Sequence, residues 1–230
     1  MPENAQYDLK IDQTAPHAGL AQEFIQALLS AESHQANQIA LQSVENGIPV
    51  KDLYMHVFQV SQREIGHLWQ TGQISVAREH FCTAATQVII SRLYPHIFNS
   101  QKIGKKLIAT CVGGELHEIG IRMVSDFFEM EGWDTYYLGA NSPDESVIST
   151  IKDQQPDVVG ISTTMYFNVP QVQELINSIR REFGETSPTI MVGGFPFLMA
   201  KDLWQQVGAD GFAPDAQQAI NLAHQLITRR

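Results

Sequence analysis

Hydrophobic residues recur with a helical period over the first hundred residues of the chain. In the segment 20–30, the apolar positions Leu20, Phe24 and Leu28 fall on one face of a helix, together with Ala27. Further segments repeat this period, and a glycine or a proline stands near the end of each; they cover residues 34–47, 50–72 and 75–98. Short polar loops separate the segments, so this part of the chain is predicted to be a four-helix bundle.

The later helices of this half have the clearest predicted boundaries. The third is expected to bury a stripe of apolar residues: Leu53, Val57, Val60, Ile65 and Leu68. Ser33 and Ser75 are placed to cap the second and fourth helices, because a serine hydroxyl accepts a backbone N–H of the first turn. Pro95 is expected to bend or end the fourth helix near Tyr94, since proline lacks the N–H. Residues 1–16 are polar and are predicted to form a loose tail.

The pattern changes after a polar linker at residues 99–106. From there, short and almost continuously apolar runs alternate with amphipathic helical segments. The runs are predicted to be strands and lie at residues 107–114, 133–139, 157–163, 189–194 and 210–213. This alternation predicts a parallel sheet with helices on both faces, buried on both sides. Because no GxGxxG motif occurs, we expect a five-stranded flavodoxin-like (Rossmann-like) domain at 101–230, after a helical cap domain at 17–100.

Composition and charge narrow the classes of function. The 230 residues include 25 acidic and 15 basic side chains, and the formal net charge of −10 argues against direct binding to nucleic acid. The two cysteines form no CxxC pair, which fits a reducing compartment without a disulfide framework. The amino terminus lacks the apolar core of a signal peptide, and no segment is apolar enough to cross a bilayer. We therefore expect a cytoplasmic protein that binds no membrane.

Glycine and polar residues collect where the predicted strands end, at Gly113–Gly114, Gly139, Ser162 and Gly193–Gly194. Ligands of open parallel sheets bind outside the carboxyl ends of the strands, so these positions are expected to meet at one rim. The hydroxyls that follow the third strand can hydrogen-bond a buried polar group, or they can serve a turn or a helix cap. The glycine pair can leave room for a ligand, or it can simply turn the chain.

The segment GGELHEIG, Gly113 to Gly120, follows the first predicted strand. Residues two apart in an extended loop point the same way, so the Glu115 carboxylate can orient the His117 imidazole. Gly120 leaves room for a bulky group to lie against the backbone. Taken alone, the segment is better explained as a solvated loop with an incidental histidine than as a ligand site.

Taken in order, these residues resemble the cobalamin-binding domain shared by methionine synthase, some mutases and corrinoid proteins. That family carries the motifs DxHxxG, SxL and GG. Here they read ExHxxG at Glu115–Gly120, SxT at Ser162–Thr164 and GG at Gly193–Gly194. The glutamate keeps a carboxylate beside the histidine, whereas the threonine makes the pocket for the cofactor tail more polar.

The resemblance implies that cobalamin is the cofactor and that His117 is its lower cobalt ligand. An imidazole is a good donor to cobalt, and a carboxylate behind it raises its basicity. The resemblance also implies cofactor contacts from a wider set of residues: Glu115, Leu116, Glu118, Ile119, Gly120, Leu138, Gly139, Ser162, Thr163, Thr164, Gly193 and Gly194.

The helical half carries a second resemblance. Trp69 is followed after nine residues by Glu79–His80, and this spacing resembles the cap of light-sensing cobalamin regulators of the CarH type. By that resemblance, Trp69, Glu79 and His80 surround an upper adenosyl group, and an indole with polar neighbours suits an adenosine. The alternative is a Trp69 in the helix core and a solvated Glu79–His80 pair. Gln70 stands where those regulators keep a second cobalt-ligating histidine, and a short tail stands where they have a MerR-like DNA-binding domain.

The resemblances lead to competing hypotheses of function. The first is a photosensory regulator: it holds adenosylcobalamin between the cap and the α/β domain, and light-driven cobalt–carbon cleavage signals to a transcriptional regulator, another signalling protein or a second copy. The alternatives are a corrinoid methyl carrier of a methyltransferase system, with methyl- or hydroxocobalamin, and a passive cobalamin-binding module. None of these needs a catalytic residue, so the chain is expected not to be an enzyme.

Overall fold

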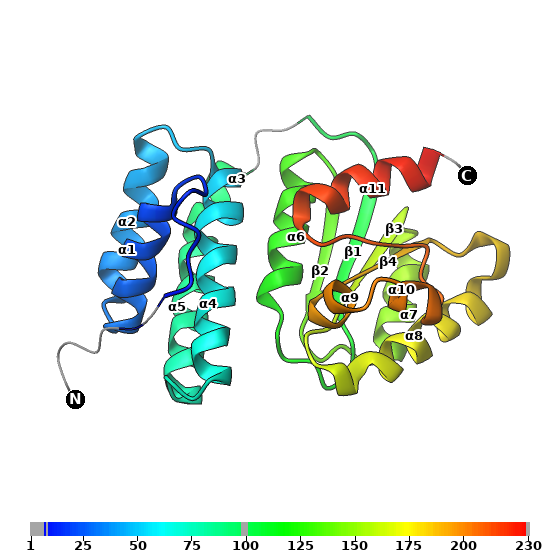
Figure 1. Ribbon diagram of the computed structural model, residues 1–230. Helices are drawn as coiled ribbons and strands as arrows, with labels where there is room; N and C mark the ends of the chain where they lie inside the picture. The colour runs from blue at the N-terminus through cyan, green and yellow to red at the C-terminus, as the bar shows by residue number, and fades with distance from the viewer. Residues whose placement is uncertain (1–6, 8, 98–100, 229–230) are drawn as a thin grey trace. The chain divides into compact units, whose positions relative to one another are not determined.

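The computed structural model describes residues 7, 9–97 and 101–228, and the chain divides into two compact units, Met1–His96 and Ile97–Arg230 (Figure 1). The first unit is helical, as predicted. Its α-helices are α1 (Ala18–Leu29), α2 (Ser33–Glu45), α3 (Val50–Asp52), α4 (Gln59–Gln70) and α5 (Val76–Leu93).

The third predicted helix is one helical run with a π-helical centre. The π-helical segment η1 (Leu53–Phe58) joins α3 to α4 without a break. The buried residues before and after this segment still lie on one face of the helical run. Tyr54 and Phe58 are fully buried, and their rings pack with centroids 5.5 Å apart. Val60 is only half-buried. The predicted stripe is therefore wrong at Val60, while its other members are buried.

The structure confirms some of the predicted helix caps and ends and contradicts one. Ser75 is the N-cap of α5, and its hydroxyl accepts a first-turn backbone N–H at 3.3 Å. Ser33 does not cap α2, because it is the first residue of that helix and Glu32 occupies the N-cap position. A 3-10 turn, η2 (Tyr94–His96), follows α5, so the helix stops before Pro95 as predicted.

The polar tail is anchored to the helical unit at residues 10–11. The backbone N–H of Lys10 donates to Glu64 Oε1 at 2.9 Å, and Ile11 is 8% exposed. Glu64 belongs to α4 and is itself buried. The expectation of a loose tail therefore does not hold at these residues, whereas residues 1–6 and 8 lie outside the described part of the chain.

The second unit is built on a parallel sheet whose order, within the described residues, is β2-β1-β3-β4-β5. Its strands are β1 (Lys106–Cys111), β2 (Asp134–Gly139), β3 (Val158–Ser162), β4 (Thr189–Gly193) and β5 (Gly211–Phe212). Its helices are α6 (Ile119–Met130), α7 (Asp144–Gln154), α8 (Val169–Phe183), α9 (Phe195–Met199), α10 (Leu203–Gln206) and α11 (Ala216–Thr228). This is the flavodoxin-like order, and the direction of chain progression changes between β1 and β3.

The apolar character of the strands follows their place in the sheet. The inner strands β1 and β3 are almost entirely buried, as continuous apolar runs predict. The edge strand β2 exposes Tyr136 and Tyr137, so the expectation of burial on both sides does not hold there. Helix α6 packs beside α11, and α7 packs beside α8, on opposite faces of the sheet (Figure 1). This packing leaves the carboxyl ends of β1, β3 and β4 at one rim.

None of the helices in the described part of the chain is long and apolar enough to span a membrane.

Candidate functional site

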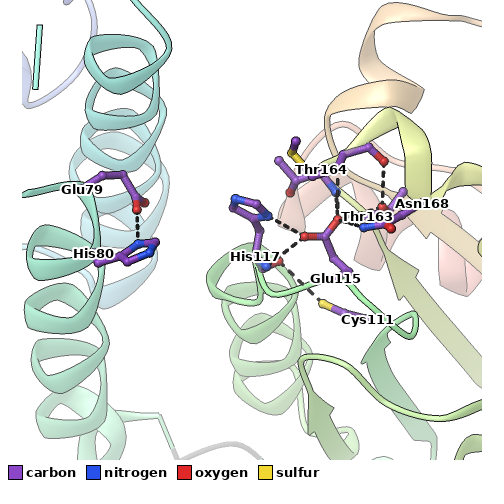
Figure 2. Close-up of polar contacts among 9 residues, drawn as sticks. Glu79, His80, Cys111, Glu115, His117, Thr163, Thr164 and Asn168 are labelled. Carbon is purple, nitrogen blue, oxygen red and sulfur yellow. Dashed lines mark hydrogen bonds and ion pairs between the residues drawn. The ribbon is translucent and has the colours of Figure 1, made fainter. Parts of the chain in front are cut away.

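A buried carboxylate joins the ends of β1 and β3 at this rim. Glu115 lies in the loop after β1 and has no exposed surface. Its Oε1 accepts the backbone N–H of His117 at 3.0 Å and lies 2.5 Å from Nδ1 of the His117 ring. Its Oε2 accepts hydrogen bonds from the loop after β3: from Thr163 Oγ1 at 2.9 Å, Thr164 N at 2.8 Å, Met165 N at 3.1 Å and Asn168 Nδ2 at 3.0 Å. Figure 2 shows Thr163, Thr164 and Asn168 beside this carboxylate.

These donors keep Glu115 ionised. Burial alone raises the pKa of a carboxyl group, because it removes water from the charged form. Here the hydrogen bonds from His117, Thr164 and Asn168 outweigh burial and hold the pKa of Glu115 well below its usual range. An ionised carboxylate only accepts hydrogen bonds, so His117 Nδ1 donates to it. Nε2 is consequently the ring nitrogen that a metal would have to use.

His117 is the exposed end of this network. Its side chain is 41% exposed, whereas that of Glu115 is 0% exposed. The Cys111 thiol, at the end of β1, donates to the His117 carbonyl oxygen at 3.6 Å. Burial raises the pKa of Cys111 to about 12, so the thiol keeps the proton it donates. The prediction that Glu115 orients His117 agrees with this geometry.

A metal at His117 would have to bring most of its own ligands. No group of three or more His, Cys, Asp or Glu side chains that could hold a metal ion occurs in the described part of the chain. A lone imidazole suits a metal that is already enclosed by a macrocycle, as the iron of haem is. The donor set therefore fits a metallated cofactor better than a free metal ion.

The glycines at the rim have different roles. A Cβ on Gly120 would meet nothing within 4 Å, so the space beside the start of α6 is open. A Cβ on Gly193 would make an ordinary contact, 3.7 Å from the carbonyl oxygen of Ala213. A Cβ on Gly194, whose φ is +105°, would collide with the backbone of Thr163. Gly194 therefore serves the close approach of two loops, rather than space for a ligand.

The loop after β2 is tied to the same rim. Glu118, just before α6, forms a hydrogen bond with the Tyr137 hydroxyl, and burial together with this bond raises the pKa of Tyr137. The Asn141 backbone N–H donates to the Glu115 carbonyl oxygen at 2.9 Å. The Asn141 Oδ1 accepts the Gly114 N–H at 2.8 Å. The loops after β1, β2 and β3 thus hold one another, which fixes the backbone on both sides of His117.

The remaining predicted contact residues differ in exposure. Leu116 is 71% exposed beside His117. Thr163 is fully buried, like Glu115, so in this conformation either can act on a ligand only through another group. Ser162 and Gly139 are also buried. Ile119, Leu138 and Thr164 are half-buried at the same rim.

Exposed apolar side chains stand around the rim. Tyr166 and Phe167 follow β3 and are 53% and 66% exposed, and Phe195 and Met199 of α9 are 45% and 64% exposed. The rings of Tyr166 and Phe195 meet edge to face, with centroids 6.3 Å apart. An exposed apolar surface of this kind indicates a place where a ligand or a partner binds.

Asn168 is a site residue that sequence reasoning missed. It is the N-cap of α8, and asparagine is a favoured residue at that position. Its side chain makes no capping bond and donates to Glu115 instead. The sequence signal was an asparagine shortly after Thr164, but that signal is the same for a helix cap and for a buried carboxylate's partner.

The helical unit contains another carboxylate–histidine pair. His80 Nδ1 lies 2.6 Å from Glu79 Oε2 (Figure 2). The Thr83 hydroxyl donates to Glu79 Oε1 at 2.9 Å. The His80 side chain is 74% exposed, whereas Glu79 is 17% exposed. Trp69, at the end of α4, is half-buried, and Gln70 is exposed. A role of Trp69, Glu79 and His80 in cofactor contact stays a prediction.

Two family models match the chain, and both describe a B12 binding domain. One covers residues 105–221, and the other covers residues 20–94. A corrinoid protein of Desulfitobacterium hafniense (strain Y51) is 22% identical over 214 residues, which are 90% of this chain and 97% of the relative. Dimethylamine corrinoid protein 1 of Methanosarcina acetivorans is 24% identical, with the same coverage of both chains.

Solved structures confirm the predicted fold. The monomethylamine corrinoid protein of Methanosarcina barkeri matches with a TM-score of 0.80 at 19% identity, over 92% of this chain and 100% of that chain. A structure of the methanol:cobalamin methyltransferase complex of the same organism matches with a TM-score of 0.50 at 18% identity, over 94% and 82% of the two chains. A helical cap followed by a five-stranded parallel sheet is the architecture of this chain.

These relatives overturn the photosensor hypothesis. The similar proteins are named as corrinoid proteins, and a methyltransferase complex is among the similar structures, so closeness to CarH-type regulators is not supported. The Trp69 and Glu79–His80 spacing was misleading because an indole near a helix end and an acid–histidine pair do not specify the group that packs against them. The light response and the signalling partner that the photosensor hypothesis predicted are therefore not supported either.

Proposed function

The chain belongs to the family of B12-binding domains, and from this premise we propose that it is a corrinoid protein that carries methyl groups within a methyltransferase system. Cobalamin is its cofactor, and the proposal specifies no particular group on the upper face of the cobalt. The proposal draws on the relatives named for dimethylamine and monomethylamine corrinoid proteins, which are similar along most of this chain.

The observation that carries the proposal is the exposed His117 ring held by a buried, ionised carboxylate. This arrangement fits cobalamin, whose cobalt arrives enclosed in a corrin ring and takes one more ligand from the protein. His117 would supply Nε2 to the cobalt, and Glu115 would keep the proton on Nδ1 and raise the basicity of the ring. The open space at Gly120 is a second point of fit, because a large ligand can lie against the backbone there.

When bound, cobalamin supplies a cobalt centre that accepts a methyl group and gives it up again. The residues of this chain hold and orient the cofactor, and the apolar side chains of the rim, such as Phe167 and Met199, offer a water-poor surface. No acid, base or nucleophile of this chain is needed for methyl transfer in this account. The partner proteins would accordingly be methyltransferases that deliver the methyl group and remove it, and they would select the methylated substrate.

Binding measurements with defined cobalamins test the proposal. A carrier should bind methylcobalamin and hydroxocobalamin at least as tightly as adenosylcobalamin, and its reduced, cobalamin-loaded form should accept a methyl group from a simple methyl donor. Illumination of the adenosylcobalamin complex should leave the oligomeric state unchanged. A strong preference for adenosylcobalamin, together with no methyl acceptance, would overturn the proposal.

A further inference from the structure

We infer that the outer edge of β2 is a contact surface for a second copy of this chain, which pairs with it as an antiparallel strand. β2 is the last strand at one side of the sheet, beside β1 (Figure 1). It spans six residues, Asp134–Gly139, and no strand in the described part of the chain pairs with its outer side. The strand at the opposite edge, β5, has only two residues. The inference goes beyond the proposed function and does not depend on it.

The outer side of β2 presents backbone donors and acceptors in a defined order. The Asp134 N–H donates to the Lys105 carbonyl oxygen at 2.8 Å, so the backbone of Asp134 faces β1. The residues of a strand at the edge of a sheet turn their backbone groups alternately toward the neighbouring strand and away from it. The N–H and C=O groups of Thr135 and Tyr137 therefore point away from β1, and they form the row that an added strand would pair with.

β2 lacks most of the features that protect an edge strand from such pairing. Natural edge strands are commonly short, bulged, covered, or interrupted by lysine or proline. β2 contains neither lysine nor proline, and its charged residue, Asp134, already lies 3.2 Å from Lys102 Nζ. Its register with β1 shifts only beyond Tyr137, so the residues that an added strand would use are regular. The side chains of Tyr136 and Tyr137 are exposed at 42% and 37%.

This edge fits a second copy of itself because its pattern is symmetric about Tyr136. When a two-fold axis passes beside Tyr136, Thr135 of each copy lies opposite Tyr137 of the other, and these residues exchange N–H and C=O groups as a hydrogen-bonded pair. The two Tyr136 residues face each other as a non-hydrogen-bonded pair, in which side chains are closest, and aromatic pairs of this kind stabilise a sheet. Asp134 then lies opposite Leu138, so no like charges meet across the pair.

Cysteine substitutions in the full chain test the register. The Cα atoms of a non-hydrogen-bonded antiparallel pair are about 4.5 Å apart, which a disulfide can span. Tyr136→Cys should therefore give a disulfide-linked dimer under mild oxidation with diamide. Thr135→Cys is the matched control, because each Thr135 lies opposite Tyr137, and the two introduced thiols would be too far apart to join. The native cysteines, Cys82 and Cys111, are buried and should not crosslink.

Sedimentation equilibrium of the full chain tests the association itself. A single pair of strands is a small interface, so the dimer should be weak and should form as the protein concentration rises. Tyr136→Asp places two carboxylates opposite each other in place of an aromatic pair, and should raise the dissociation constant about tenfold. Tyr136→Phe keeps the aromatic pair and should leave the dissociation constant close to that of the wild type.

Hydrogen exchange of the wild-type protein needs no variant and completes the test. The backbone amides of Thr135 and Tyr137 should exchange more slowly at high protein concentration than at low concentration, since pairing protects them. A chain that remains monomeric at every concentration overturns the inference, even if β2 pairs with a strand of a different protein. A dimer that Tyr136→Asp does not weaken, or equal crosslinking of Thr135→Cys and Tyr136→Cys, places the contact elsewhere and overturns it as well.

Discussion

Replacing Gly194 by alanine tests the packing that holds the rim together. Gly194 has φ 105° and ψ 177°, a backbone conformation that is nearly exclusive to glycine. A side chain there costs about 1–3 kcal/mol in backbone strain. Its Cβ would also collide with the Thr163 backbone, and forced overpacking costs about 1–3 kcal/mol more. We expect Gly194→Ala to lower the free energy of unfolding of the α/β unit by about 4 kcal/mol, the sum of the two midpoints.

The neighbouring Gly193 supplies a matched control. A Cβ at Gly193 makes only an ordinary contact, 3.7 Å from Ala213 O, so Gly193→Ala should cost less than about 1 kcal/mol. Urea unfolding followed by tryptophan fluorescence measures both variants. The assay should use a Trp69→Phe background, because Trp133 and Trp204 then report on the α/β unit alone.

A shift of the Thr163 backbone also displaces its hydroxyl from Glu115. Gly194→Ala should therefore weaken cobalamin binding as well as folding. Gly193→Ala is the control for the stability measurement only. Equal unfolding free energies for the two variants would refute the steric argument, because they differ in the collision with Thr163 and in backbone conformation.

Further predictions concern the carboxylate, the open glycine and a buried thiol. Glu115→Gln places an amide N–H against donors and should weaken cobalamin binding about 10- to 100-fold in a titration; unchanged affinity would contradict the role of the carboxylate. Gly120→Ala should leave the apoprotein as stable as the wild type, or more stable by about 1 kcal/mol, and yet weaken cobalamin binding, since it fills open space. Equal binding would show that no ligand lies there. Burial raises the pKa of Cys82 to about 11, so a thiol reagent should label it slowly at pH 8, and faster as pH rises or urea is added; rapid labelling of the native protein would argue against its burial.

The fold could be predicted because its signals are local. The inner strands are continuous apolar runs, and glycine or proline marks most element ends, so periodicity places them within a few residues. The π-helical segment Leu53–Phe58 could not be predicted, because the apolar pattern through it is also that of an ordinary α-helix. Val60 lies beside the buried stripe, which continues through Val57 and Ser61.

The site could be predicted only where its contacts are short in sequence. Glu115 and His117 are two residues apart, and their interaction follows from loop geometry. Asn168 and Gly194 act on residues that are far away in sequence, and only the fold brings those loops together. The motifs therefore identified the family and the candidate ligand, but not the residues that hold the ligand in place. The function of the helical cap was predicted wrongly for a related reason, since the spacing of Trp69, Glu79 and His80 does not specify the group that they contact.

The electron paramagnetic resonance spectrum of the cobalamin-loaded protein in its Co(II) state, prepared with ¹⁵N-labelled histidine, tests the ligand assignment most directly. If His117 is the lower ligand, the nitrogen splitting should change from a triplet in unlabelled protein to a doublet in labelled protein. His117→Ala should abolish the doublet. A triplet that persists in the labelled wild-type protein would mean that the cofactor keeps its own base, and it would contradict the assignment of His117.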